Sequence, residues 1–204
     1  LSQPAVQVVN LNQSLILGSG SVIEDVKGGS LDDVLTGNSL ANTLTGNAGN
    51  DTMTGGSGND TYVFGPASSA EADVVAEGTN QGSDTLSFAS LTTNVTLALN
   101  SSLVQAVHAN RTLKLNAGGT FENILGGSGN DVLTGNSLDN SFTGNAGNDT
   151  MTGGGGNDTY VFGPAAVAEA DIVAEGANQG SDTLSFASLT TAVTFNLSQN
   201  IVQA

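Results

Sequence analysis

The residues best suited to chemistry in this 204-residue chain are acidic side chains that recur every nine positions beside glycines. Units close to the pattern G-G-x-G-x-D-x-U-x, in which U is apolar, occur four times from Gly28 and four times again from Gly126. Carboxylate and backbone carbonyl oxygens that converge at such turns are the ligands that Ca2+ takes in proteins. Because the chain has no cysteine and only one histidine, the spacing predicts Ca2+ rather than Zn2+.

Each place in the unit has a physical role in a parallel β-roll. The first six residues form a turn, and the last three form a short strand whose eighth residue points inward. Glycines at the first, second and fourth places permit positive φ and close carbonyl approach, and asparagine at the fifth place tolerates the left-handed conformation. The eighth-place residues are therefore the predicted core: Leu35, Leu44, Met53, Tyr62, Leu133, Phe142, Met151 and Tyr160.

Candidate metal ligands follow from the stacking of turns two units apart, where one ion can take ligands from both turns. The central predicted pairs are Asp33 with Asp51, Asn42 with Asp60, Asp131 with Asp149, and Asn140 with Asp158. Extending the register backwards, and forwards past an insertion, adds these flanking ligands: Glu24, Asp73, Asp84, Glu122, Asp171 and Asp182. Backbone carbonyls are expected near Gly28, Ser30, Gly46, Ala48, Gly55, Ser57, Gly126, Ser128, Gly144, Ala146, Gly153 and Gly155. Two carboxylates per ion should bind more tightly than one carboxylate and one amide.

The chain is a tandem duplication. Subtracting 28 from 126 gives an offset of 98 residues, under which residues 28–99 and 126–197 are identical at 59 of 72 positions. This predicts two modules, 1–98 with a core at about 19–88 and 99–204 with a core at about 117–186. The spacer after each array also alternates like a β-structure. The expected fold is all-β: two right-handed parallel β-rolls whose spacers extend the solenoid or form small lobes.

Composition narrows the function. Nineteen acidic residues against three basic ones give a formal charge of −16, which excludes nucleic acid as a partner and favours multivalent cations. With few aromatic residues and 28 glycines, the core is thin, so bound metal must contribute to stability. No apolar run predicts a transmembrane helix. Because the sequence begins at Leu1 and stops within the pattern at Ala204, we expect a piece of a longer polypeptide, with any export signal outside it.

The arrays resemble a known family. The segments GGSGNDTYVF and GGGGNDTYVF, with the regular units before them, are similar to haemolysin-type calcium-binding (RTX) repeats over about 36 residues per copy. The resemblance implies secretion by a bacterium and folding on extracellular calcium. Three leucines, Leu31, Leu40 and Leu138, replace the fourth glycine, and Asn42 and Asn140 replace the sixth aspartate. Sites that use those turns are expected to be weaker or empty.

Three functions remain open, and none of them is catalytic. His108 is the only histidine and has Asn10 at its counterpart position, so we expect no enzyme. The leading hypothesis is a calcium-rigidified structural module of a large adhesin or surface protein, with neighbouring modules as partners. The alternatives are the secretion and folding domain of an RTX toxin or exoenzyme, and a calcium-dependent surface-layer component. A longer run of 98-residue repeats, an enzymatic domain or an ordered array would distinguish the three.

Overall fold

The computed structural model describes residues 22–78, 82–116, 120–176 and 179–197, together with the backbone of strands β1 (Val6–Asn10) and β2 (Gln13–Ile16). All regular structure in these ranges is β-strand. The described residues thus contain no helix with the length and apolarity needed to cross a membrane. Most strands have three residues, as the nine-residue unit predicts.

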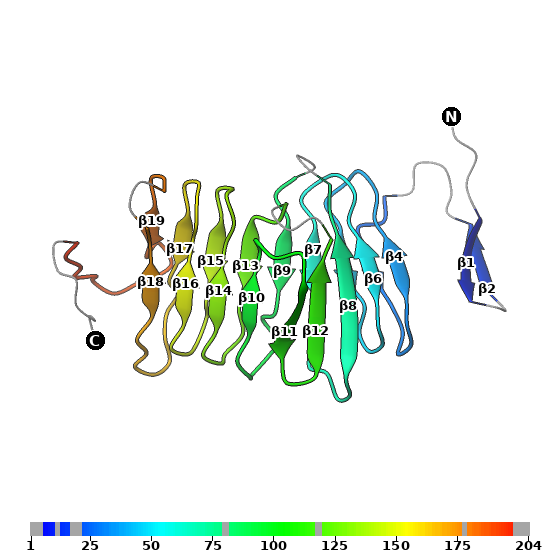
Figure 1. Ribbon diagram of the computed structural model, residues 1–204, viewed down its shortest axis with the longest axis horizontal. Coiled ribbons are helices and arrows are strands. Elements are labelled where there is room, and N and C mark those ends of the chain that lie inside the picture. Colours follow the sequence, from blue (N-terminus) through cyan, green and yellow to red (C-terminus); the bar gives the residue numbers. More distant parts are fainter. Residues whose placement is uncertain are drawn as a thin grey trace.

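The chain winds as a stack of coils whose strands alternate between two faces (Figure 1). The first face is one parallel sheet of eight strands, in which each strand pairs with its counterpart in the next coil. Its strands, in order, are β3 (Asp25–Lys27), β5 (Thr43–Thr45), β7 (Thr61–Val63), β9 (Thr85–Ser87), β13 (Asn123–Leu125), β15 (Ser141–Thr143), β17 (Thr159–Val161) and β19 (Thr183–Ser185). Because β9 of the first copy pairs with β13 of the second, this sheet runs unbroken through both copies.

The second face holds two sheets that meet between the copies. The first contains β4 (Val34–Thr36), β6 (Thr52–Thr54), β8 (Glu71–Ala76), β12 (Arg111–Leu115) and β11 (Val104–His108). The other contains β10 (Thr96–Ala98), β14 (Val132–Thr134), β16 (Thr150–Thr152) and β18 (Ile172–Ala174). Within these two sheets all strand pairs are parallel except β11 with β12. The all-β parallel roll predicted from the nine-residue unit is confirmed.

The spacer both extends the solenoid and adds a hairpin to it. Strand β10 continues the coils by pairing with β14, whereas the β11–β12 hairpin extends the sheet of β8. The carboxamide of Gln105, on β11, joins the two sheets. It accepts a hydrogen bond from the Ala98 N–H and donates one to the Ala98 carbonyl, both over 2.8 Å. The Gln105 side chain thus makes the two hydrogen bonds that a peptide group of a neighbouring strand would make, at the point where the second face passes from one sheet to the other.

The core runs along the axis between the two faces, and the strands of both faces contribute to it. All eight predicted inward residues are fully buried except Leu35, which is partly buried in the first coil. Aromatic rings stack between coils, with ring centroids 5.3 Å apart for Phe142 and Tyr160 and 5.0 Å apart for Phe64 and Phe88. Such stacking stabilises the core beyond the contribution of the buried apolar area.

Two expectations about the turns need correction. Positive φ occurs at second- and fourth-place glycines such as Gly56 and Gly58, whereas first-place Gly55 is needed for space, because a Cβ there would collide with the Asp60 carboxylate. The asparagines with positive φ are Asn47 and Asn145, at the second place and not the fifth. Fifth-place side chains instead accept hydrogen bonds from the next coil, because their exposed oxygens lie over its N–H groups.

Candidate metal centre

The sixth-place side chains stack into columns that follow the coils. The long column precedes the strands of the first face and contains Glu24, Asn42, Asp60, Asp84, Glu122, Asn140, Asp158 and Asp182. Two short columns precede strands of the second face: Asp33, Asp51 and Asp73 in the first copy, and Asp131, Asp149 and Asp171 in the second. All predicted side-chain ligands thus lie in one of three rows.

A repeated hydrogen bond fixes each carboxylate within its column. The N–H of one sixth-place residue donates to the carboxylate of the next coil, over 2.9 Å from Asp33 to Asp51 and 2.7 Å from Asn42 to Asp60. The second copy repeats both bonds at 2.8 and 2.7 Å. The same bond reaches the flanking residues Asp73, Asp84, Glu122, Asp171 and Asp182. The four predicted pairs are therefore adjacent in the fold; their role as calcium ligands stays a prediction.

Four of these aspartates keep a buried oxygen that has no partner among the described residues. Asp51, Asp60, Asp149 and Asp158 are each 1% exposed, and in each the second carboxylate oxygen has no hydrogen bond. Leaving a buried polar oxygen unpaired costs about 1–3 kcal/mol, and more when the group is charged. A divalent cation satisfies such an oxygen without needing a proton. The donor set therefore fits Ca2+, which prefers carboxylate and carbonyl oxygens.

The other central positions close their own turns. Asp33 and Asp131 accept the N–H of the residue four places earlier, over 2.6 and 2.8 Å. Asn42 and Asn140 do the same with their amide oxygen, while their amide nitrogen donates to carbonyls of the preceding coil. At these turns a neutral amide, whose N–H groups donate and cannot ligate a cation, stands where the other units have a carboxylate. The structure thus gives a physical reason for the expected weakness of the asparagine turns.

Some of the predicted backbone carbonyls lie close to the sixth-place side chains, and their role as ligands stays a prediction. A Cβ placed on Gly28 or Gly126 would meet the carbonyl of Gly46 or Gly144 in the next coil as well as a sixth-place carboxylate, at 2.6 and 2.7 Å from the carbonyl oxygens. The carbonyls of Gly55 and Gly153 likewise approach the turns of the asparagine units. Of the predicted carbonyl ligands, those of Gly46, Gly55, Gly144 and Gly153 lie beside the columns of sixth-place side chains. Glu24 begins the long column as an exposed side chain.

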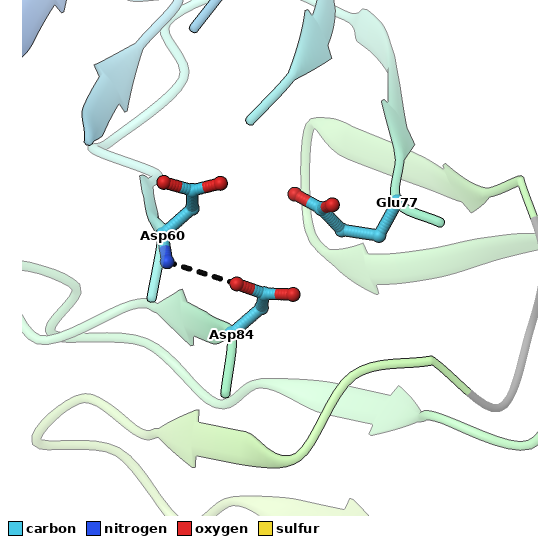
Figure 2. Close-up of side chains that lie close together, drawn as sticks. All are labelled: Asp60, Glu77 and Asp84. Carbon is cyan, nitrogen blue, oxygen red and sulfur yellow. Dashed lines mark hydrogen bonds between the residues drawn. The ribbon is translucent and has the colours of Figure 1, made fainter. Parts of the chain in front are cut away.

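A third carboxylate that the sequence reasoning missed joins the long column where each array closes. Figure 2 shows Glu77 directed toward Asp60 and Asp84. One carboxylate oxygen from each of the three residues lies within 4.8 Å of the others, and all three residues are buried. The second copy repeats the group as Asp158, Glu175 and Asp182. Each group thus brings three carboxylates together; in the first copy all three residues are buried, whereas Glu175 and Asp182 are exposed.

Glu77 stands at the first place of its turn, where other units have glycine. It immediately follows β8, and a Cβ on Gly55 in the preceding coil would lie 2.5 Å from its carboxylate. The Tyr62 hydroxyl donates to one Glu77 oxygen, and the other oxygen has no partner among the described residues. Glutamate replacing glycine after the strand, in both copies, was the signal available in the sequence.

Burial makes these carboxylates reluctant to ionise without a cation. Loss of solvent raises the pKa of Glu77 to about 7, with further upward contributions from Asp84 and Asp60. Burial likewise raises the pKa of Asp149 to about 7, aided by Asp131 and two other acids. The pKa values of Asp60 and Asp158 are raised for the same first reason. Repeated upward shifts at clustered acids mark a site that needs a positive counter-charge.

Asp73 is placed differently from the other predicted ligands. One oxygen accepts the Asp51 N–H over 3.0 Å, but the other forms a buried ion pair with the guanidinium of Arg111. The same guanidinium contacts the Glu71 carboxylate over 2.6 Å. Arg111 is 3% exposed and belongs to β12 of the spacer hairpin. A cation from the protein itself therefore lies at the end of this short column.

Stacked glycine-rich turns that hold buried carboxylates in register define a metal-binding parallel β-roll. The profile described as "RTX calcium-binding nonapeptide repeat (4 copies)" matches residues 27–62, 117–137 and 125–160. The two arrays of this chain are RTX calcium-binding repeats, as the resemblance indicated. No curated protein of similar sequence was found for comparison.

Proposed function

We propose that this chain is a calcium-dependent structural module whose stacked turns bind several Ca2+ ions, so that a slender β-roll becomes rigid outside the cell. RTX repeats imply a calcium-binding structural role. The observation that carries the proposal is a set of four buried aspartate oxygens that have no hydrogen-bond partner among the described residues, at Asp51, Asp60, Asp149 and Asp158. A surface or secreted location in a bacterium, within a large adhesin, is the further part of the proposal.

The strongest sites in this proposal lie at the closing turns. Asp60, Glu77 and Asp84 supply three carboxylates from three places in the chain, and calcium affinity rises with the number of charged ligands. When bound, Ca2+ supplies the positive charge that neutralises carboxylates in adjacent coils. Tyr62 orients Glu77 through its hydroxyl, so the third ligand is held in place before an ion arrives.

The metal requirement follows from the thin core. Each ordered residue loses about 1–2 kcal/mol of backbone entropy, while a coil contributes one or two inward side chains at about 1.5–3 kcal/mol each. An ion present at about 100 times its dissociation constant adds roughly 2.7 kcal/mol per independent site. Without ions the clustered carboxylates repel one another, so the metal-free chain is expected to be largely unfolded.

Calcium titration of chelator-treated chain tests the proposal. Circular dichroism should show strand content and melting temperature rising with calcium, and calorimetry should show uptake of several ions. Mg2+ should substitute poorly because it demands compact octahedral coordination. A metal-free chain with the same strand content and melting temperature would contradict calcium-driven folding.

Two variants test where the calcium ions bind. Asp60→Asn should lower calcium uptake at the closing turn, because it removes one of three carboxylates. Asp25→Asn is the matched control, since Asp25 is exposed and the second copy carries Asn123 at the same place. Equal loss of uptake in the two variants would reject the columns as the binding sites.

The adhesin setting is preferred over the two alternatives because one sheet runs through both copies, which suits an array whose task is to span distance. A secretion domain of a toxin or exoenzyme, or a surface-layer component, would use the same calcium sites. The encoding reading frame distinguishes them. Further 98-residue repeats favour the adhesin, whereas a catalytic domain upstream would overturn that setting and leave the calcium-binding role intact.

A further inference from the structure

Three carboxylates share one buried space where the first array closes. Asp60, Glu77 and Asp84 are 1%, 7% and 1% exposed, and one oxygen of each lies within 4.8 Å of the other two (Figure 2). Two oxygens that bind one ion at about 2.3–2.6 Å, the distances found for Ca2+, lie up to about 5 Å apart. The spacing of the three carboxylates therefore suits a single ion of the size of Ca2+.

Backbone hydrogen bonds fix this group and still leave oxygens free for an ion. The Asn42 N–H donates to one oxygen of Asp60 over 2.7 Å, and the Asp60 N–H donates to one oxygen of Asp84 over 2.8 Å. The second oxygens of Asp60 and Glu77 are buried and have no hydrogen-bond partner among the described residues. These two buried oxygens, and not the acidity of the cluster alone, point to a bound cation.

Tyr62 holds Glu77 in a form that suits an ionised carboxylate. The phenol oxygen accepts the Gly55 N–H over 2.5 Å, and the hydroxyl donates to one oxygen of Glu77. A hydrogen bond donated to a carboxylate favours its charged form. Around a cation, all three carboxylates of the group can therefore be ionised together, which gives the group three negative charges.

No basic side chain in the described part of the chain balances these three charges. Both ion pairs found there are made by Arg111, with Glu71 and Asp73, and Lys27 and Lys114 are exposed. Three ionised carboxylates and one Ca2+ leave one net negative charge, whereas three carboxylates and a trivalent ion leave none. Because an uncompensated charge is costly in a buried place, the group favours the third positive charge.

We propose that the Asp60–Glu77–Asp84 group binds trivalent cations of about the size of Ca2+, such as lanthanide ions, in preference to Ca2+ itself. Lanthanide ions share the preference of Ca2+ for carboxylate and carbonyl oxygens and carry the additional charge. The inference rests on the proposed metal-binding role of this group and adds a charge preference to it. A pair such as Asp33 with Asp51 offers two carboxylates, so a divalent ion already balances it.

The tyrosines of the chain provide a local probe for this test. The chain has two tyrosines and no tryptophan, and each tyrosine donates to the glutamate of one closing turn, Tyr62 to Glu77 and Tyr160 to Glu175. Excited tyrosine transfers energy to a nearby Tb3+, so terbium emission reports these two groups. Tyr160→Phe keeps the ring that stacks on Phe142 and leaves Tyr62 as the remaining sensitiser.

The Tyr160→Phe chain, folded in Ca2+, is titrated with Tb3+ while calorimetry records total uptake. Emission should saturate within the first two equivalents, because each copy holds one such group, and before the remaining sites fill. It should be half-maximal with Ca2+ in at least about 100-fold excess over Tb3+. Adding Glu77→Gln should lower that excess at least about tenfold, because two carboxylates remain. Adding Asp32→Asn is the matched control, since it removes the same charge from an exposed position and should leave the excess unchanged.

Half-maximal emission at a Ca2+ excess below about tenfold, or emission that grows only after the remaining sites have filled, would overturn the preference for trivalent ions. Calcium uptake is measured in the same samples, so either result with uptake intact leaves the proposed calcium role standing. A chain that takes up neither ion would reject both proposals. If Glu77→Gln does not fold, the order of emission and total uptake in the Tyr160→Phe chain still decides the question.

Discussion

The two copies end their short columns differently, although their arrays are nearly identical. In the first copy, Asp73 and Glu71 share the buried guanidinium of Arg111. In the second, the described residues place no basic side chain beside Asp171 and Glu169, and these acids raise the pKa of Asp149 further. Burial raises the pKa of Asp51 in the first copy as well, but there the charge of Arg111 offsets part of the rise. Among the described residues, a protein cation thus balances the acids of the first copy's short column only.

This difference explains how the same turn sequence can depend on metal to different degrees. Desolvation raises the pKa of both Asp51 and Asp149, so burial is common to the two. What differs is the element that packs beside the short column. In the first copy this element is the β11–β12 hairpin. We therefore expect the dependence on Ca2+ to vary with the element packed beside an array as well as with the array itself.

Arg111→Gln would break the comparison most strongly. Glutamine is chosen because Gln13 occupies the counterpart of position 111, in β2. Removing one partner of a buried ion pair costs about 3–5 kcal/mol, so the free energy of unfolding should fall by that amount. The loss should shrink as calcium rises, because an ion can replace the guanidinium beside Asp73. Denaturant unfolding at two calcium concentrations that both fold the original chain measures it.

Lys114→Gln is the control for this substitution, since Lys114 is an exposed residue of the same strand. It should change stability by less than about 0.5 kcal/mol. If Arg111→Gln destabilises equally at low and high calcium, the guanidinium does not take the place of an ion.

Asp149→Asn and Asp51→Asn sharpen the comparison at the next level. Both remove a carboxylate whose second oxygen is buried and has no hydrogen-bond partner in the described part of the chain. The loss of calcium affinity should be at least about tenfold, or ~1.4 kcal/mol, for Asp149→Asn. It should be smaller for Asp51→Asn, because Arg111 already neutralises the neighbouring acids. Calorimetric titration of each variant measures the two losses, and equal losses would show that Arg111 does not reach the Asp51 site.

Acidification should weaken calcium binding in both copies, through Asp149 in the second and Glu77 in the first. The pKa of Asp149 is about 7 in the folded chain against 3.8 ordinarily, so the metal-free fold holds a proton that the unfolded chain releases. Its stability therefore rises as pH falls through about 7, and the gain is complete below about 3.8. Calcium must displace that proton, so affinity falls by up to about tenfold per pH unit for each proton released.

Calcium titrations at pH 8 and pH 6, in buffers of different ionisation enthalpy, measure this proton release. Glu77, whose pKa is also about 7, should contribute in the first copy. The variant Asp149→Asn should lose the second-copy part of the pH dependence. A calcium midpoint that does not move between the two pH values would contradict the burial of these acids.

Much of the fold and columns follows from sequence spacing. A period of nine residues fixes which side chains share a face, and 18-residue separations give the pairs found at Asp33 with Asp51. The register survives insertions, because the ladder still forms across 22 residues to Asp73 and 24 residues to Asp84. Periodicity succeeds here because each coil repeats the same backbone path.

What periodicity missed lies outside the repeat. Glu77 occupies a glycine place after a longer turn, so its carboxylate enters the column from a position that the unit assigns to backbone. Arg111 and Gln105 belong to the spacer, and their contacts depend on the docking of the β11–β12 hairpin. Such contacts are long-range pairings between non-repeating residues, for which spacing carries no information.

The smallest expected effect concerns Asp32, whose counterpart is Asn130. Asp32 accepts the Asn50 N–H over 2.8 Å on the exposed fifth-place row, and Asn130 accepts the Asn148 N–H over 2.9 Å in the same way. An amide oxygen thus suffices, so Asp32→Asn should change stability by less than about 0.5 kcal/mol and leave calcium uptake unchanged. Asp32→Ala removes the bond and should cost about 0.5–1.5 kcal/mol, again without loss of calcium. Asp51→Ala, in the buried sixth-place column, should lower calcium uptake. Similar losses of calcium uptake for Asp32→Ala and Asp51→Ala in calorimetry would contradict the assignment of the ions to the sixth-place column.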